Sequence, residues 1–150
     1  MRLVIQRVAR ASVSVEGQQV SAIGPGLMVL VGVERGDTQA DVDWLADKTA
    51  GLRIFSDEEG VMNRSILDTG GELLAVSQFT LTASTRKGKR PSYFRAAPGE
   101  ESEPLYEAWC RRMESLLDRP VGRGVFGADM KVELINDGPV TIIIDSRLRE

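Results

Sequence analysis

Two strand-like runs near the C-terminus are separated by Asp137-Gly138-Pro139, and this feature restricts the fold more than any other. The runs are KVELIN (131–136) and VTIIID (140–145). An Asp-Gly pair between such runs is a hairpin signal, but the proline removes a backbone donor where the second strand begins. A hairpin corner with a trans bond is the common outcome, because only about 5–6% of X-Pro bonds in folded proteins are cis. A cis Gly-Pro would instead form a rigid wall without side chains.

The rest of the chain indicates further strands within one domain that covers residues 1–150. Loose alternation over 3–15 predicts one or two strands. The apolar run 27–33, which follows a Gly-Pro-Gly turn, predicts a buried strand. The segment ELLAVSQFTL (72–81) predicts a central strand that leads into a long exposed loop.

Two segments have the period of a helix. The first contains a possible capping box, Thr38 with Asp41, and ends near Gly51. The second ends at Pro120. Two helices among many strands, without strict alternation, predict an α+β fold with a mixed or largely antiparallel, barrel-like sheet. The apolar stripe of the second helix consists of Leu105, Ala108, Trp109, Met113, Leu116 and Leu117.

The residues that are missing exclude several kinds of site. The chain has no histidine and a single cysteine, Cys110. Hydrolases of the Ser-His-Asp and Cys-His types are therefore excluded, and a zinc site would need carboxylates almost alone, which suit that metal poorly. We predict no metal and no cofactor. Catalysis in such a chain must use backbone groups, hydroxyls, carboxylates or the substrate itself.

Charge and hydropathy limit the partners and the location. The formal net charge of -3 argues against a generally basic nucleic-acid coat protein, although a local basic patch is compatible with it. No run of about 18 apolar residues is present, so no membrane span is predicted. The N-terminus is interrupted by arginines and lacks the apolar core of a signal peptide. A cytoplasmic location is expected.

Three further segments could carry chemistry. Ser77-Gln78-Phe79-Thr80 follows an apolar strand and offers hydroxyls, an amide and turning backbone N–H groups for an oxyanion; an ordinary strand is the alternative. Four cations within 86–90 precede Tyr93 and Phe94, which suits phosphate contact or base stacking as well as a solvated charge run. Glycines within 122–130 could admit a ligand beside Phe126 or Met130, or mark a tight hairpin.

The segments SQFTL (77–81) and NDGPVT (136–141) together resemble the two signature motifs of the D-aminoacyl-tRNA deacylases. The resemblance covers essentially the whole chain, including VIQRV near the start, GPGLMVLVGV and GVFGADM. The segment RPSY departs mildly from the family's frequent RPSF. The two motifs in this order, at this separation and in a chain of this length, make a specific match. The resemblance implies the deacylase fold.

The resemblance also implies a function and an assembly. The family's proteins are cytoplasmic homodimers that hydrolyse the ester between a D-amino acid and the 3′ end of tRNA. It implies that Gly138-Pro139 is cis and reaches into the partner's pocket, where it rejects L-amino acids by a clash and admits glycine. Arg7 would lock this wall through hydrogen bonds to carbonyls; a surface salt bridge is the alternative. The partners implied are tRNA and a second copy, with no membrane and no DNA.

Roles for the other residues follow from the same resemblance. The backbone around Gln78, Phe79 and Thr80, with Ser77, would line the ester. Water would attack with help from the terminal ribose 2′-hydroxyl. The terminal adenosine would bind Phe126, Gly127 and Met130, and the tRNA backbone would contact Lys87, Lys89 and Arg90. Two alternatives remain: a non-catalytic RNA-binding module that uses 86–95, and an esterase whose nucleophile is Thr80 or Ser77, for which the sequence supplies no base.

Overall fold

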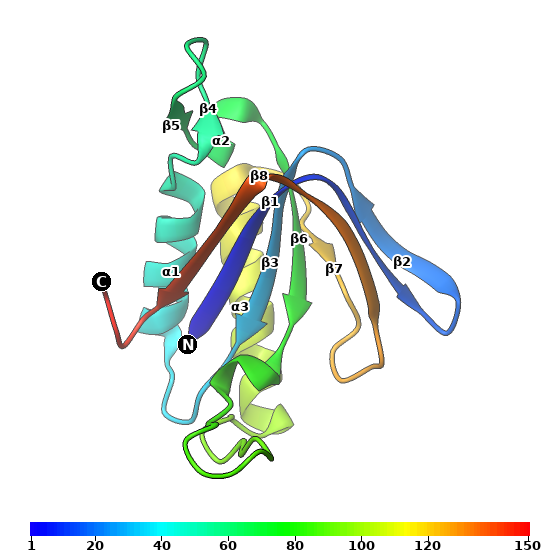
Figure 1. Cartoon of the computed structure of the whole chain (residues 1–150), viewed down its shortest axis with the longest axis vertical. Helices are drawn as coiled ribbons and strands as arrows, with labels where there is room; N and C mark the ends of the chain where they lie inside the picture. The colour runs from blue at the N-terminus through cyan, green and yellow to red at the C-terminus, as the bar shows by residue number, and fades with distance from the viewer.

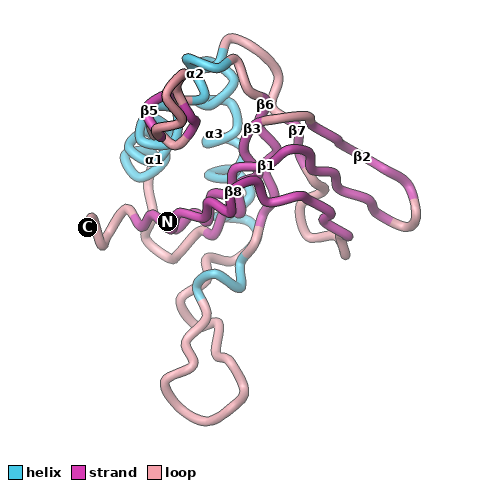
Figure 2. Tube along the Cα trace, turned by 45° about the horizontal axis from the view of Figure 1, so that its top comes forward, coloured by secondary structure: helices cyan, strands magenta, loops and turns pink.

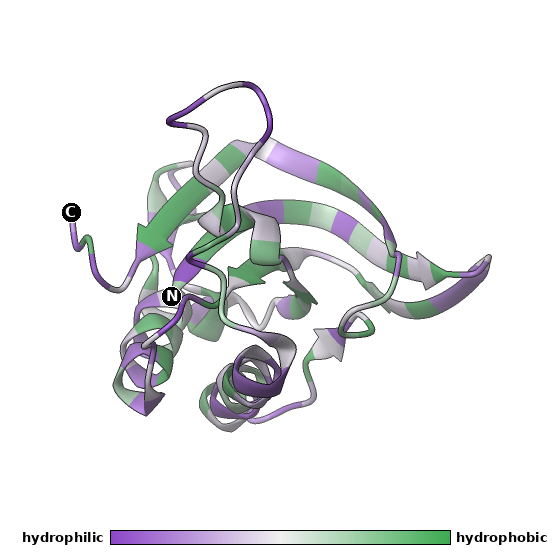
Figure 3. Ribbon diagram, turned by 90° about the horizontal axis from the view of Figure 1, so that it is seen from below, coloured by the Kyte–Doolittle hydropathy of each residue, from purple (hydrophilic) through white to green (hydrophobic).

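The computed structural model describes residues 1–150 and contains a curled, mixed sheet with its two long helices on one side (Figures 1 and 3). The strand order is β2-β1-β3-β6-β7, and β8 pairs with β1 outside this path. This arrangement confirms the α+β fold with a mixed, barrel-like sheet. The strands of this sheet are β1 (Arg2–Val15), β2 (Gln18–Ile23), β3 (Gly26–Gly32), β6 (Glu72–Ser77), β7 (Gly122–Arg123) and β8 (Lys131–Asp145).

The two C-terminal runs form one strand rather than a hairpin. Both halves of β8 pair antiparallel with β1: Leu134 lies opposite Ala11, and Ile144 lies opposite Leu3. The register shifts between Gln6 and Arg10, at the level of the Gly-Pro step. The hairpin alternative is therefore wrong, because each run finds its hydrogen-bond partner in β1 and not in the other run. The Gly138-Pro139 peptide bond is cis, as the family resemblance implies.

The central strand β6 is shorter than the sequence predicts. It pairs in parallel with β3 up to Ser77 opposite Val31, and the chain then turns into a 3-10 helix, η1 (Phe79–Thr82). The strand predicted to run to Leu81 therefore ends four residues earlier. Gly32 permits this turn, since a Cβ there would lie 2.9 Å from Leu81 Cβ and 3.1 Å from the Gln78 carbonyl oxygen.

The helices cover the core face of the sheet. Helix α1 (Gln39–Gly51) begins with the predicted capping box of Thr38 and Asp41. Helix α3 (Gly99–Leu117) packs on α1 and buries Trp109 and Met113 from the predicted stripe. It ends before Pro120, because Asp118 takes a left-handed conformation. The short elements are β4 (Phe55–Ser56), β5 (Met62–Arg64) and α2 (Ile66–Thr69).

Figure 2 shows the segment after η1 as a long loop that extends away from the sheet and from the tip formed by β5 and α2. None of the helices combines the length and the apolar character needed to cross a membrane.

Candidate functional site

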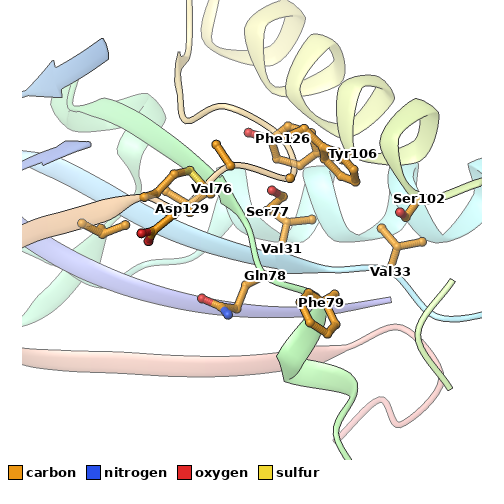
Figure 4. A pocket seen from close by; sticks show the side chains of 14 residues that line it. Val31, Val33, Val76, Ser77, Gln78, Phe79, Ser102, Tyr106, Phe126 and Asp129 are labelled. Carbon is orange, nitrogen blue, oxygen red and sulfur yellow. The ribbon is translucent and has the colours of Figure 1, made fainter. Parts of the chain in front are cut away.

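A cavity of about 280 Å³ lies where β6 ends (Figure 4). Its lining comes from the end of β3, the end of β6 with the start of η1, α3, and the loop that leads into β8 with the first residues of that strand. Of the residues predicted to carry function, the cavity brings together six, from segments about 50 residues apart in sequence. They are Ser77, Gln78, Phe79, Phe126, Gly127 and Met130.

Two backbone N–H groups beside this cavity have no hydrogen-bond acceptor within the chain. They belong to Phe79 and Thr80, the first residues of η1, because the first N–H groups of a helix lack intrahelical partners. The third predicted donor, the N–H of Gln78, donates a hydrogen bond to the Val31 carbonyl at 2.8 Å. The oxyanion site predicted around three N–H groups is thus reduced to two adjacent ones.

Thr80 itself does not line the cavity. Its hydroxyl accepts a hydrogen bond from the Gln78 side-chain amide, and no carboxylate or amine hydrogen-bonds to it. The local structure therefore gives this hydroxyl no base that could remove its proton.

The opposite wall of the cavity is aromatic and firmly held. The ring of Phe126 lies 5.9 Å from that of Tyr106 between centroids, in a tilted arrangement. The Tyr106 hydroxyl donates to the Ala75 carbonyl at 3.0 Å, which fixes this ring to β6. Met130 completes the wall beside Gly127. This surface offers a flat apolar contact for a planar ring.

Two titratable groups at this wall, Cys110 and Tyr106, are neutral at neutral pH. Burial raises the pKa of the Cys110 thiol to about 12, and burial likewise raises the pKa of Tyr106, with Cys110 beside it. Neither group supplies a thiolate or phenolate nucleophile. No group of three or more His, Cys, Asp or Glu side chains is placed to hold a metal ion.

Arg7, Gly138 and Pro139 lie apart from this cavity. The Arg7 guanidinium bridges two carbonyls, with Nε donating to Asp137 at 3.0 Å and Nη1 donating to Ile54 at 2.7 Å. Its Nε also lies 3.6 Å from the Asp137 carboxylate, so the backbone contacts are the closer ones. Gly138 and Pro139 are both exposed.

The Gly-Pro corner has little room for a side chain. Gly138 has φ +128°, and a Cβ there would lie 2.8 Å from Val140 Cγ2 and 2.9 Å from Arg7 Nη2. The Asn136 side chain accepts from the Val140 N–H and donates to the Thr141 hydroxyl, each at 3.1 Å. The corner is thus held from both sides. Asn136 belongs to the NDGPVT motif, but the sequence alone does not indicate that it supports the turn.

The basic residues Lys87, Lys89 and Arg90 occupy the extended loop after η1, away from the cavity. All three are exposed and form no ion pair within the chain. They are therefore free to contact an anionic partner.

Sequence reasoning missed part of the cavity lining, notably Val31, Val33, Tyr106 and Asp129. The pattern around the two valines indicates only a buried strand. Tyr106 lies next to Leu105, which begins the predicted helical stripe, and its contact with Ala75 depends on tertiary packing. Asp129 is the acidic residue of GADM, and its spacing alone carries no signal for a pocket.

Comparisons with known proteins match this arrangement over nearly the whole chain. The family model described as D-Tyr-tRNA(Tyr) deacylase matches residues 4–145. A D-aminoacyl-tRNA deacylase of Bacteroides thetaiotaomicron is 59% identical over 150 residues, which cover 100% of both chains. A solved structure of a c-Myc DNA Unwinding Element Binding Protein has TM-score 0.91 and 41% identity, covering 97% of this chain and 98% of that one. A probable eukaryotic D-amino acid tRNA deacylase shares the fold, with TM-score 0.81 and 18% identity over 95% and 97% of the chains.

Proposed function

The chain belongs to the D-Tyr-tRNA(Tyr) deacylase family, and on this premise we propose that it hydrolyses the ester of D-aminoacyl-tRNA. The observation that carries this proposal is the pair of unpaired N–H groups, of Phe79 and Thr80, beside a cavity with an aromatic wall. Such donors stabilise the oxyanion of acyl transfer without a side-chain base. The setting of this reaction would be the cytoplasm, where charged tRNA is used.

The proposed reaction assigns a part to each side of the cavity. The terminal adenine stacks on Phe126 beside Gly127 and Met130, and the ester carbonyl points toward the N–H groups of Phe79 and Thr80. Water attacks the carbonyl carbon, the bond from that carbon to the tRNA 3′-oxygen breaks, and a proton passes to this leaving oxygen. The ribose 2′-hydroxyl assists the water, which agrees with a chain without histidine. The products are the free amino acid and tRNA.

We propose that chirality is selected by Gly138-Pro139 from a second copy of the chain. Neither residue lines the cavity of its own chain, whereas both are exposed, and Arg7 donates to the carbonyl of Asp137 just before them. Strand β8 pairs with β1 alone, so its other edge is open, and it exposes Ile135 (47%) and Ile143 (68%). An open edge with exposed apolar residues favours a homodimer. The wall would exclude an L side chain and admit D-amino acids and glycine.

A non-catalytic nucleic-acid-binding function is the second candidate. The unpaired cations of the 86–90 loop favour it, as does the name of the relative described as a DNA unwinding element binding protein. An esterase with Thr80 or Ser77 as nucleophile is less well supported, since no base contacts the Thr80 hydroxyl.

Hydrolysis of three charged tRNAs by the purified protein tests the proposal. We expect rapid release of D-tyrosine and glycine from their tRNAs and no release from L-tyrosyl-tRNA. Equal release of D- and L-tyrosine would indicate a general esterase. Tight binding of tRNA without any release would favour the binding module.

A further inference from the structure

An exposed aromatic side chain at the cavity contacts a second exposed ring, and a third exposed ring follows it in the chain. Phe79 lines the cavity and is 56% exposed, and the neighbouring Tyr93 and Phe94 are 40% and 67% exposed. The rings of Phe79 and Tyr93 meet edge to face, with centroids 5.0 Å apart. We call these three residues the aromatic rim. Nothing in the proposed reaction uses Tyr93 or Phe94.

The backbone beneath the aromatic rim is firmly held, although the loop that precedes it is long. Ser84 and Ser92 exchange two backbone hydrogen bonds of 2.8 and 2.9 Å, which close the base of the loop. The Ala96 N–H donates to the Tyr93 carbonyl at 3.0 Å, and Arg35 Nε donates to the Phe94 carbonyl at 3.2 Å. The side chains of Tyr93 and Phe94 are thus exposed to water although the backbone that carries them is ordered. Exposed aromatic side chains on an ordered backbone indicate a binding surface.

Positive charge precedes the aromatic rim in the same loop. Arg90 comes three residues before Tyr93, and Arg86, Lys87 and Lys89 come just before Arg90. Exposed rings beside unpaired cations are the pattern that binds single-stranded nucleic acid, because bases stack on the rings and phosphates meet the cations. A second copy of the chain is a poorer occupant, since it would desolvate these cations without phosphates to neutralise them.

We propose that the aromatic rim binds the unpaired nucleotides that precede the terminal adenosine of tRNA. This inference rests on the proposed function, which places that adenosine in the cavity. The strand would leave the cavity past Phe79, stack on Tyr93 and Phe94, and bring its phosphates to the 86–90 loop. The rim would then contribute to recognition of the RNA and not to the chemistry at the ester.

Binding of uncharged fragments tests the rim without any need for hydrolysis. The probes are adenosine and the single-stranded trinucleotide that ends tRNA, titrated calorimetrically into the full-length protein. We expect the trinucleotide to bind about tenfold more tightly than adenosine, as expected for one stacked base. In Phe94→Ala this advantage should fall severalfold, whereas Met62→Ala, an exposed apolar residue on β5, should retain it. Equal binding of both probes by the wild type would overturn the inference.

Hydrolysis of two substrates gives the second readout. In Phe94→Ala and Tyr93→Ala, kcat/KM for D-tyrosyl-tRNA should fall about tenfold, while kcat/KM for D-tyrosyl-adenosine should stay unchanged. Tyr93→Phe should behave as the wild type. An equal loss on both substrates would overturn the inference, because Tyr93 would then act through Phe79 on the cavity. If the wild type cleaves neither substrate but keeps its preference for the trinucleotide, the proposed reaction fails and the rim stands.

Discussion

The cavity at the end of β6 and the Gly-Pro corner of β8 both offer backbone groups, but in the proposed reaction each supplies only half of a selective site. The cavity has depth, an aromatic wall and two free N–H donors, but neither Gly138 nor Pro139 lines it. The corner has a crowded, exposed backbone, and the space beside it is open and almost without apolar lining. Gly138 lies eight positions after Met130, which corresponds to about 25 Å of extended strand. This difference supports the proposal that one chain supplies the pocket and a second copy supplies the wall.

The largest effect is expected at the corner. In Gly138→Ala the new methyl group would meet Val140 and Arg7 at under 3 Å, and the residue would be strained at positive φ. We predict a loss of about a hundredfold in kcat/KM for D-tyrosyl-tRNA. Gly17→Ala is the matched control, since Gly17 also has positive φ (+78°) but open space around it. Turnover near the wild-type rate would contradict the wall.

The support of the corner should have the next largest effect. Arg7→Lys keeps the charge but cannot bridge the carbonyls of Asp137 and Ile54 together. We predict a loss of about tenfold in kcat/KM for D-tyrosyl-tRNA, as expected when one charged hydrogen bond is removed. Arg112→Lys, at an exposed ion pair with Asp47, serves as the control. Full activity of Arg7→Lys would indicate that Arg7 acts only as an ordinary salt-bridge partner of Asp137.

Substitutions in the basic loop should weaken tRNA binding without altering the cavity or the Gly-Pro corner. We predict that Lys87→Ala combined with Arg90→Ala weakens tRNA binding about fivefold and reduces the slope of log K against log salt by roughly 1.5, because two phosphate contacts are lost. The measurement is tRNA affinity over a range of salt concentrations. An unchanged slope would remove this loop from the tRNA footprint.

The smallest effect is expected at the hydroxyl next to the cavity. Thr80→Ala removes the acceptor of the Gln78 side chain but leaves the Thr80 N–H in place. We predict that kcat for D-tyrosyl-tRNA changes by no more than about threefold, the cost of one weak hydrogen bond. Complete loss of activity, with a covalent acyl intermediate in the wild type, would support the Thr80 nucleophile instead.

Sequence reasoning predicted those parts of the fold that depend on local pattern. The capping box at Thr38 and the apolar stripe of α3 follow from spacing of three and four residues, so both are confirmed. The end of β6 was misplaced because the turn after Ser77 depends on the space over Gly32, which a pattern of strand residues does not reveal. The sequence also did not predict that residues 131–145 form one strand, because the partner strand β1 lies more than 100 residues away.

The candidate site was predicted unevenly for the same reason. Motifs carried by the family resemblance named Phe126 and Met130, which the fold brings beside Ser77. The reduction from three free N–H groups to two required the contact between Gln78 and Val31, a pairing between strands. Tyr106, which holds the aromatic wall through Ala75, needed the packing of α3 on β6. Contacts distant in sequence therefore account for what was missed.

Two inactive variants combined in one dimer test most directly whether pocket and wall come from different copies. Gly138→Ala disables the wall, and Phe126→Ala disables the pocket. Chains with different affinity tags are co-expressed, and the mixed dimer is isolated by both tags. Its one intact pocket then faces one intact wall, so we predict recovery of about half of the wild-type activity on D-tyrosyl-tRNA, as in a twofold dimer. A mixed dimer no more active than the mean of its parents would contradict the shared site.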